Sequence, residues 1–177
     1  MKFITAAVAL IATCTTLFAA QAATFDLTYT GANFSLSAEL DATDLGGGDW
    51  LITGLSGTVF DGSSEPVTLI PGGPGAFLTP SGAFIVNNVL YYPPSSGQYF
   101  DIDGLAFTAS GAEWNLWGNG SSYTLGTCQG GCYTFDYGTA VVSQVPEIST
   151  WAMMALGFAC VGLAGYNTKH RRAEATI

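Results

Sequence analysis

Two short segments hold residue types that could bind a ligand. Asp101 and Asp103 stand two apart in a predicted strand, and Gly104 behind them predicts a bulge. Oxygen ligands beside such a bend suit Ca²⁺, although acids that only solubilise an outer face fit the same pattern. Trp114 and Trp117 stand three apart, so on a regular strand they face opposite sides. We expect one in the core, while the other either packs on a turn or offers a ring that stacks on sugars.

A third segment, TCQGGC, places Cys128 and Cys132 on either side of two glycines that permit a tight turn. Zinc takes about four nitrogen or sulfur ligands, and no histidine or third cysteine stands nearby. We therefore expect a structural disulfide between the two cysteines across the end of a hairpin.

The charge balance excludes several kinds of chemistry. Residues 23–143 contain no Lys, Arg or His, and they contain eleven acids: Asp26, Glu39, Asp41, Asp44, Asp49, Asp61, Glu65, Asp101, Asp103, Glu113 and Asp136. Nucleic-acid binding requires cations that neutralise phosphates, so we expect none. A Ser-His-Asp or Cys-His arrangement cannot be assembled either. A glycosidase needs only two carboxylates, but nothing in the sequence selects a pair, so we predict no catalytic residue.

The apolar N-terminal stretch has the features of a secretory signal peptide. It carries one early cation, Lys2, and ends in the small residues Ala20 and Ala22 that a signal peptidase reads. We predict a signal peptide at 1–22, cleaved after Ala22, and hence export into an oxidising compartment.

The region 23–143 alternates apolar and polar residues, which is typical of strands with one buried face. Turn-forming sequences such as GGGD, PGGPG, PPSSG and NG separate the runs. Many short strands without a helical stretch predict an all-β domain, an antiparallel, jelly-roll-like sandwich. The expected strands are 25–29, 34–40, 50–53, 57–60, 67–70, 83–92, 99–109, 113–117, 123–126 and 132–142.

The C-terminal region predicts one membrane span. Residues 148–166 are uncharged, and their number lies within the roughly 17–25 residues that cross a bilayer. Aromatic residues stand near both ends of this stretch, and the cations Lys169, Arg171 and Arg172 follow it, which places that end in the cytoplasm.

This region also resembles a known sorting signal. A short polar motif precedes the apolar stretch and the basic tail 169–172; its residues are Val145, Pro146, Glu147, Ser149, Thr150 and Trp151. Motif, span and basic cluster in this order resemble the PEP-CTERM signal of Gram-negative bacteria over residues 144–172, with Ile148 in place of the usual second proline. The resemblance implies recognition by an exosortase, a membrane enzyme of the cysteine-protease type, which removes the tail. More loosely, 50–59 and 100–107 resemble uncharacterised partners of such signals.

Together these patterns predict a non-enzymatic protein of the cell surface or extracellular matrix. Its expected partners are signal peptidase, an exosortase, membrane lipid before processing and extracellular polysaccharide, with no cofactor beyond a candidate Ca²⁺. The alternatives are a carbohydrate- or calcium-binding surface module, then a carboxylate-based glycoside hydrolase, and an ordinary C-terminal anchor in place of the sorting signal.

Replacing Pro146 and Glu147 together by alanine tests the sorting hypothesis, because it removes the motif and keeps the span. We expect the full-length chain to accumulate unprocessed at the inner membrane, as measured by blotting of fractionated cells. Unchanged processing and location would refute the hypothesis.

Overall fold

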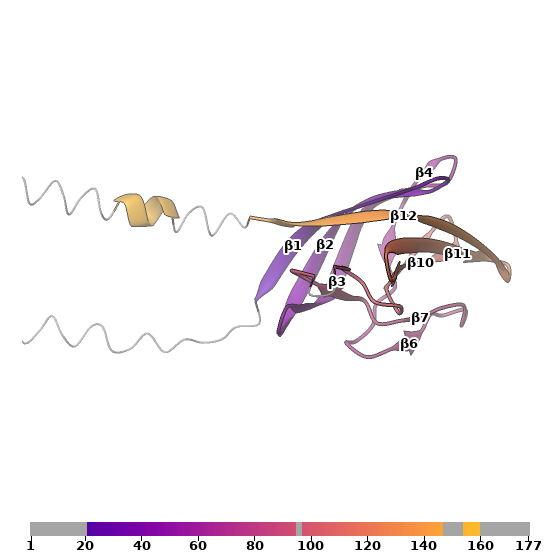
Figure 1. Cartoon of the computed structure of the whole chain (residues 1–177), viewed down its shortest axis with the longest axis horizontal. Helices are drawn as coiled ribbons and strands as arrows, with labels where there is room; N and C mark the ends of the chain where they lie inside the picture. Colours follow the sequence, from indigo (N-terminus) through magenta and orange to yellow (C-terminus); the bar gives the residue numbers. More distant parts are fainter. Residues whose placement is uncertain (1–20, 95–96, 147–153, 160–177) are drawn as a thin grey trace, which may run out of the picture.

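The computed structural model describes residues 21–94, 97–146 and 154–159. Twelve strands occupy the region between 22 and 145 (Figure 1). Their bounds are β1 Ala22–Gly31, β2 Ser35–Gly46, β3 Asp49–Phe60, β4 Ser64–Pro66, β5 Thr68–Leu69, β6 Phe77–Leu78, β7 Ile85–Val86, β8 Val89–Tyr91, β9 Leu105–Ala109, β10 Ala112–Asn119, β11 Ser122–Gln129 and β12 Cys132–Val145.

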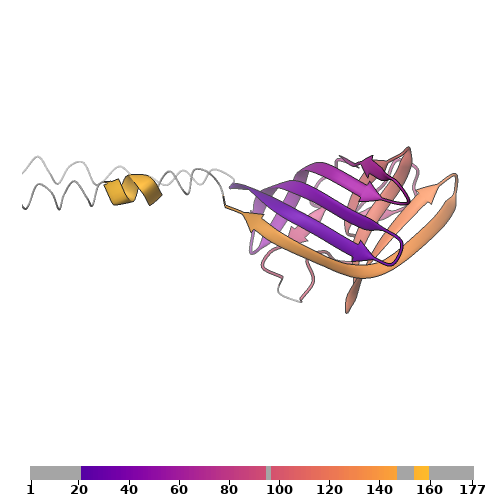
Figure 2. The same ribbon diagram turned by 90° about the horizontal axis from the view of Figure 1, so that it is seen from above.

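One continuous antiparallel sheet contains ten of these strands, in the order β4-β3-β2-β1-β12-β11-β10-β9-β5, with β8 paired to β3. The long strand β12 joins its two halves: residues up to Gly138 pair with β11, and residues from Gly138 onward pair with β1. Figure 2 shows this strand running beside β1 and curving toward the other half. A side chain at position 138 would overlap the backbone of Thr30, so the close approach at the bend requires glycine.

The two edges of the sheet come together through one short segment. β4 pairs with β3, while β5, two residues further on, pairs with β9. The sheet therefore curls into a nearly closed barrel, which leaves little unpaired edge. The predicted all-β, antiparallel class is confirmed, and the two halves face each other across the core as in a sandwich, joined through β12.

The core fills the inside of this barrel. The alternation predicted for the first two strands is confirmed: in β1, for example, Phe25, Leu27 and Tyr29 are buried, and Asp26 and Thr28 between them are exposed. The central residues from the other half are Leu105, Phe107, Trp114, Leu116 and Leu125.

Several predicted strands differ from those observed. The runs 50–53 and 57–60 belong to one strand, β3, which has an irregular register opposite Asp41. The predicted strand 83–92 is split into β7 and β8 because Asn88 takes a left-handed conformation with φ of 53°. The strand predicted from residue 99 begins only at Leu105, since residues 101–104 form a turn with Gly104 at φ 70°.

The buried carboxylate of Asp136 holds the turn between β1 and β2. It accepts hydrogen bonds from the backbone N–H groups of Ala32, Asn33 and Phe34, at 2.9 to 3.2 Å, and from the Asn33 amide at 3.3 Å. Burial by itself raises the pKa of Asp136, but these donors outweigh it and leave the pKa below its usual value. The hydroxyl of Tyr29 donates a hydrogen bond to the backbone carbonyl of Asp136. Burial together with the charge of Asp136 raises the pKa of Tyr29 to about 12.

Most of the predicted targeting segments lie outside the described residues: 1–20 with Ala20, Glu147 to Trp151, and the cations at 169–172. Ala22 is the first residue of β1, and Val145 is the last of β12 and pairs with Thr24. The two ends of the barrel that lead to these segments therefore lie together (Figure 1). Among the described residues, no helix has the length and apolar character needed to cross a bilayer.

Replacing Asp136 by asparagine should destabilise the barrel by about 3 kcal/mol at neutral pH, because the new NH₂ group would face N–H donors. In the native protein the folded pKa is lowered, so the stabilisation is present above about pH 4, the usual aspartate pKa, and is lost as the pH falls through the folded value. Chemical denaturation across the acid range measures both effects. The exposed Asp61→Asn is the control, and equal stability of the two variants would contradict the role of Asp136.

Candidate carbohydrate site

An excursion of the chain, residues 71–87, covers part of the outer face of β9, β10 and β11. It carries β6 and β7, which lie below β10 in Figure 1. Phe84 and Val86 from the excursion pack with Ile70 and Ala106 into a second, smaller apolar cluster. This cluster holds the excursion against the sheet and leaves a groove at its margin.

Two polar contacts fix the excursion in place. At its base, the buried side chain of Asn88 donates to the carbonyl of Ile70 at 2.7 Å and accepts from the N–H of Ala106 at 2.8 Å. Further out, the carboxylate of Glu113 accepts hydrogen bonds from the N–H and hydroxyl of Ser81 at 2.8 and 2.6 Å. Burial raises the pKa of Glu113, but these hydrogen bonds outweigh it and the pKa lies below its usual value.

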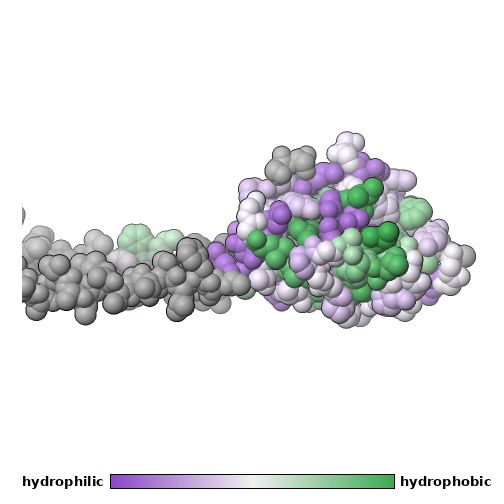
Figure 3. All heavy atoms as spheres, turned by 90° about the horizontal axis from the view of Figure 1, so that it is seen from below, coloured by the Kyte–Doolittle hydropathy of each residue, from purple (hydrophilic) through white to green (hydrophobic). Residues whose placement is uncertain are grey.

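We call the hollow beside the excursion the aromatic groove. Its volume is about 490 Å³. It is lined by Ala83, Phe84, Ile85, Ile102, Asp103, Asn115, Trp117, Tyr133 and Phe135. Figure 3 shows apolar residues gathered on one face of the barrel, and the exposed apolar side chains of the groove include Ile85, Ile102 and Tyr133.

The rings in the groove contact one another. Trp117 meets Phe135 edge to face with ring centroids 5.8 Å apart, Tyr133 stacks on Phe135 at 6.0 Å, and Phe84 meets Tyr133 at 5.9 Å. Gly126 of β11 lies beneath: a Cβ there would be 2.8 Å from the Phe135 ring and 2.9 Å from the Trp117 ring. The missing side chain on β11 thus lets the two rings lie over the strand.

The two predicted tryptophans take different places, as their spacing implied. Trp114 is buried in the core, where it stacks on Phe107 and meets Phe34 edge to face. Trp117 lies on the outer face and lines the aromatic groove. The structure therefore leaves Trp117 as the candidate for sugar contact and gives Trp114 a packing role.

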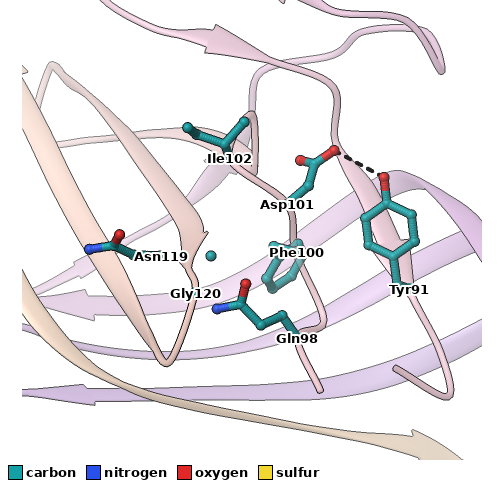
Figure 4. Close-up of a pocket in the computed structure, with 8 residues that line it drawn as sticks. Tyr91, Gln98, Phe100, Asp101, Ile102, Asn119 and Gly120 are labelled. Atoms are coloured by element: carbon teal, nitrogen blue, oxygen red, sulfur yellow. Dashed lines mark hydrogen bonds between the residues drawn. The ribbon is translucent and has the colours of Figure 1, made fainter. Parts of the chain in front are cut away.

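Asp101 is occupied by hydrogen bonds. One carboxylate oxygen accepts from the Asn87 amide at 2.8 Å and the Tyr91 hydroxyl at 3.0 Å, and the other from the N–H groups of Asp103 and Gly104 at 3.0 and 3.1 Å. Figure 4 shows the carboxylate turned toward Tyr91, with Ile102 projecting the other way. Burial and this hydrogen bond raise the pKa of Tyr91 to about 12, so the hydroxyl stays a donor at neutral pH.

Asp103 differs from Asp101 although it stands only two residues away. Its N–H donates to Asp101 and its carbonyl accepts from the Asn115 amide at 3.1 Å, so its hydrogen bonds within the described residues are made by the backbone. Asp103 lines the aromatic groove, and burial together with the charge of Asp101 raises the pKa of its carboxyl group. The predicted acidic pair therefore consists of one structural carboxylate and one that is free to meet a ligand.

A calcium site at this pair has little support in the geometry. Four donors already occupy the oxygens of Asp101. Across the described ranges, no group of three or more Asp, Glu, His or Cys side chains is placed to hold a metal ion.

The predicted disulfide between Cys128 and Cys132 is wrong. The hairpin of β11 and β12 pairs Gln129 with Cys132, and it pairs Cys128 with Tyr133. Cys128 is therefore not directly opposite Cys132 in the hairpin. Cys128 is a free thiol that packs against the cluster under the excursion.

The lining residues of the groove that the sequence did not reveal include Phe84, Asn115, Tyr133 and Phe135. A signal for two of them was present, since Tyr133, Phe135 and Tyr137 alternate within a predicted strand and so share one face. All three are exposed in the structure. Phe84 and Asn115 had no such signal, because their position depends on how the excursion folds back.

A comparison with known protein families, curated proteins and solved structures found no match for this chain.

Replacing Gly126 by alanine tests the architecture of the groove. The added methyl would overlap the rings of Trp117 and Phe135, so we expect their displacement and a loss of about 1–3 kcal/mol in unfolding free energy. Near-ultraviolet circular dichroism and denaturation measure these effects. Gly75→Ala is the control, since open space surrounds that position. Unmoved rings and native stability would contradict the packing described.

Proposed function

We propose that this chain is an exported, non-enzymatic module that binds carbohydrate through the aromatic groove. The observation that carries the proposal is the combination of rings and acceptors in one groove: Trp117 and Phe135 offer apolar faces, and Asp103 and Asn115 stand beside them. Sugar rings have apolar C–H faces and hydroxyl donors, so they match such a surface in both respects.

Asn115 lines the groove as a buried amide. Its Nδ2 is satisfied by the carbonyl of Asp103, but its Oδ1 is buried and has no hydrogen-bond partner among the described residues. An unmade hydrogen bond of this kind costs about 1–3 kcal/mol.

Binding is favoured over hydrolysis by the state of the carboxylates. Glycoside hydrolysis through carboxylates needs two, one on each side of the scissile bond. Asp103 lines the groove with a free carboxylate, whereas the neighbouring Asp101 is held by four donors. For this reason the two alternative functions, a glycosidase and a calcium-binding module, have less support than carbohydrate binding.

The proposal includes delivery to the cell surface or the extracellular matrix. It is supported by the sequence of the two ends, a secretory signal at 1–22 and a PEP-CTERM-like signal at 144–172 that an exosortase would process. β12 ends at Val145, directly at the start of this motif. Because the barrel's two ends lie together, both signals would emerge from one end of the module.

Replacing Trp117 by alanine tests the proposed function. We expect the native chain to bind members of a glycan array, with or without Ca²⁺, and the variant to bind the same glycans at least about tenfold more weakly, which corresponds to 1.4 kcal/mol. Isothermal titration calorimetry on the array hits gives the affinities.

The control for this experiment is Phe60→Ala, which removes an exposed ring from β3 in the other half of the barrel. Two results would overturn the proposal: a native chain that binds no glycan, or a Trp117 variant that binds as well as the Phe60 variant. Hydrolysis of a bound glycan would show that the glycosidase function is to be preferred over binding alone.

A further inference from the structure

The aromatic groove carries a negative charge without a protein counterion. Asp103 lines the groove, no hydrogen bond from the described residues reaches its carboxylate, and residues 23–143 contain no Lys, Arg or His. The negative charge of Asp103 lies close to that of Asp101, whose carboxylate already accepts four hydrogen bonds. A cationic group of the ligand could therefore pair with the Asp103 carboxylate without competing against a Lys, Arg or His side chain of residues 23–143.

The rings beside Asp103 favour the same kind of ligand. Phe84, Trp117, Tyr133 and Phe135 line one groove and contact each other pairwise. Aromatic faces attract ammonium groups by about 0.5–2 kcal/mol through the ring quadrupole, most strongly at Trp. Rings together with a carboxylate therefore suit a cationic amine that is attached to an apolar or amphipathic body.

A second hollow shares the exposed side chain of Ile102 with the aromatic groove, so a ligand of more than one unit that crosses Ile102 would contact both. Ile102 lines both the aromatic groove and a neighbouring hollow of about 430 Å³, whose wall includes the amide side chains of Gln98 and Asn119 (Figure 4). These amides offer both donors and acceptors to sugar hydroxyls and carry no charge. The two hollows together therefore fit an oligosaccharide whose charged group lies at the aromatic end.

We propose that the preferred ligand is a polysaccharide with free amino groups, a deacetylated amino sugar, whose ammonium lies between the Asp103 carboxylate and the rings of Trp117 and Phe135. This inference rests on the proposed carbohydrate binding and names its substrate class. Acidic glycans such as uronic-acid or sulfated polymers are repelled by eleven carboxylates without a cation.

The test compares three oligosaccharides of equal length with the full chain: glucosamine, N-acetylglucosamine and glucose oligomers. Calorimetry is done at low and at high ionic strength, because salt screens the general attraction between an acidic protein and any cation more than a contact inside the groove. We expect the glucosamine oligomer to bind at least about tenfold more tightly than the other two, and this preference to persist at high salt.

Variants assign the preference to the groove. Asp103→Asn should abolish most of the preference, because it should lower the affinity for the glucosamine oligomer much further than the affinity for the neutral oligomers, and Asp103→Glu should retain it. Asp26→Asn removes the same charge from an exposed position on β1 and should bind like the native chain. Thermal unfolding of each variant confirms that the fold is intact.

The outcomes separate this inference from the proposed function. Equal affinity for all three oligomers, or equal effects of Asp103→Asn and Asp26→Asn, would overturn the amino-sugar preference and leave carbohydrate binding standing. Absence of binding to all three oligomers and to the glycan array would overturn both.

Discussion

The barrel contains carboxylates but no side-chain cation, and this constraint determines how its polar parts are held together. Buried or half-buried acids must take their hydrogen bonds from neutral N–H and O–H donors. Asp136 accepts from the turn between β1 and β2, Asp101 fixes the turn before β9, and Glu113 ties the excursion to β10. Each acid joins segments distant in sequence or shapes a turn, so the acids are part of the architecture as well as a source of solubility.

The same constraint distinguishes Asp103 from the acids around it. Asp103 lines a groove whose other walls are rings, aliphatic side chains and an amide, and no donor among the described residues reaches its carboxylate. The groove itself depends on the excursion, which Asn88 anchors at its base, and on the bare backbone of Gly126 beneath the rings. Architecture and site are therefore coupled: the outer cluster that covers the sheet also builds the groove wall.

The sequence predicted the periodic parts of this structure and missed those that depend on long-range closure. Alternation at Phe25, Leu27 and Tyr29 was sufficient to assign a half-buried strand, and the spacing of Trp114 and Trp117 was sufficient to place them on opposite faces. The prediction of a disulfide was wrong because the spacing of two cysteines does not reveal the register of the hairpin, which sets Gln129 opposite Cys132. The roles of Asp101 and Asp103 diverged because a turn, with donors from Asn87 and Tyr91, replaced the expected strand.

The central claim is that the aromatic groove is where the chain meets carbohydrate. A crystal structure of the protein with a glucosamine oligosaccharide tests it most directly. We expect a sugar ring against Trp117 and Phe135, with its amino group within hydrogen-bond distance of the Asp103 carboxylate. A sugar bound at another surface, with the aromatic groove empty, would contradict it.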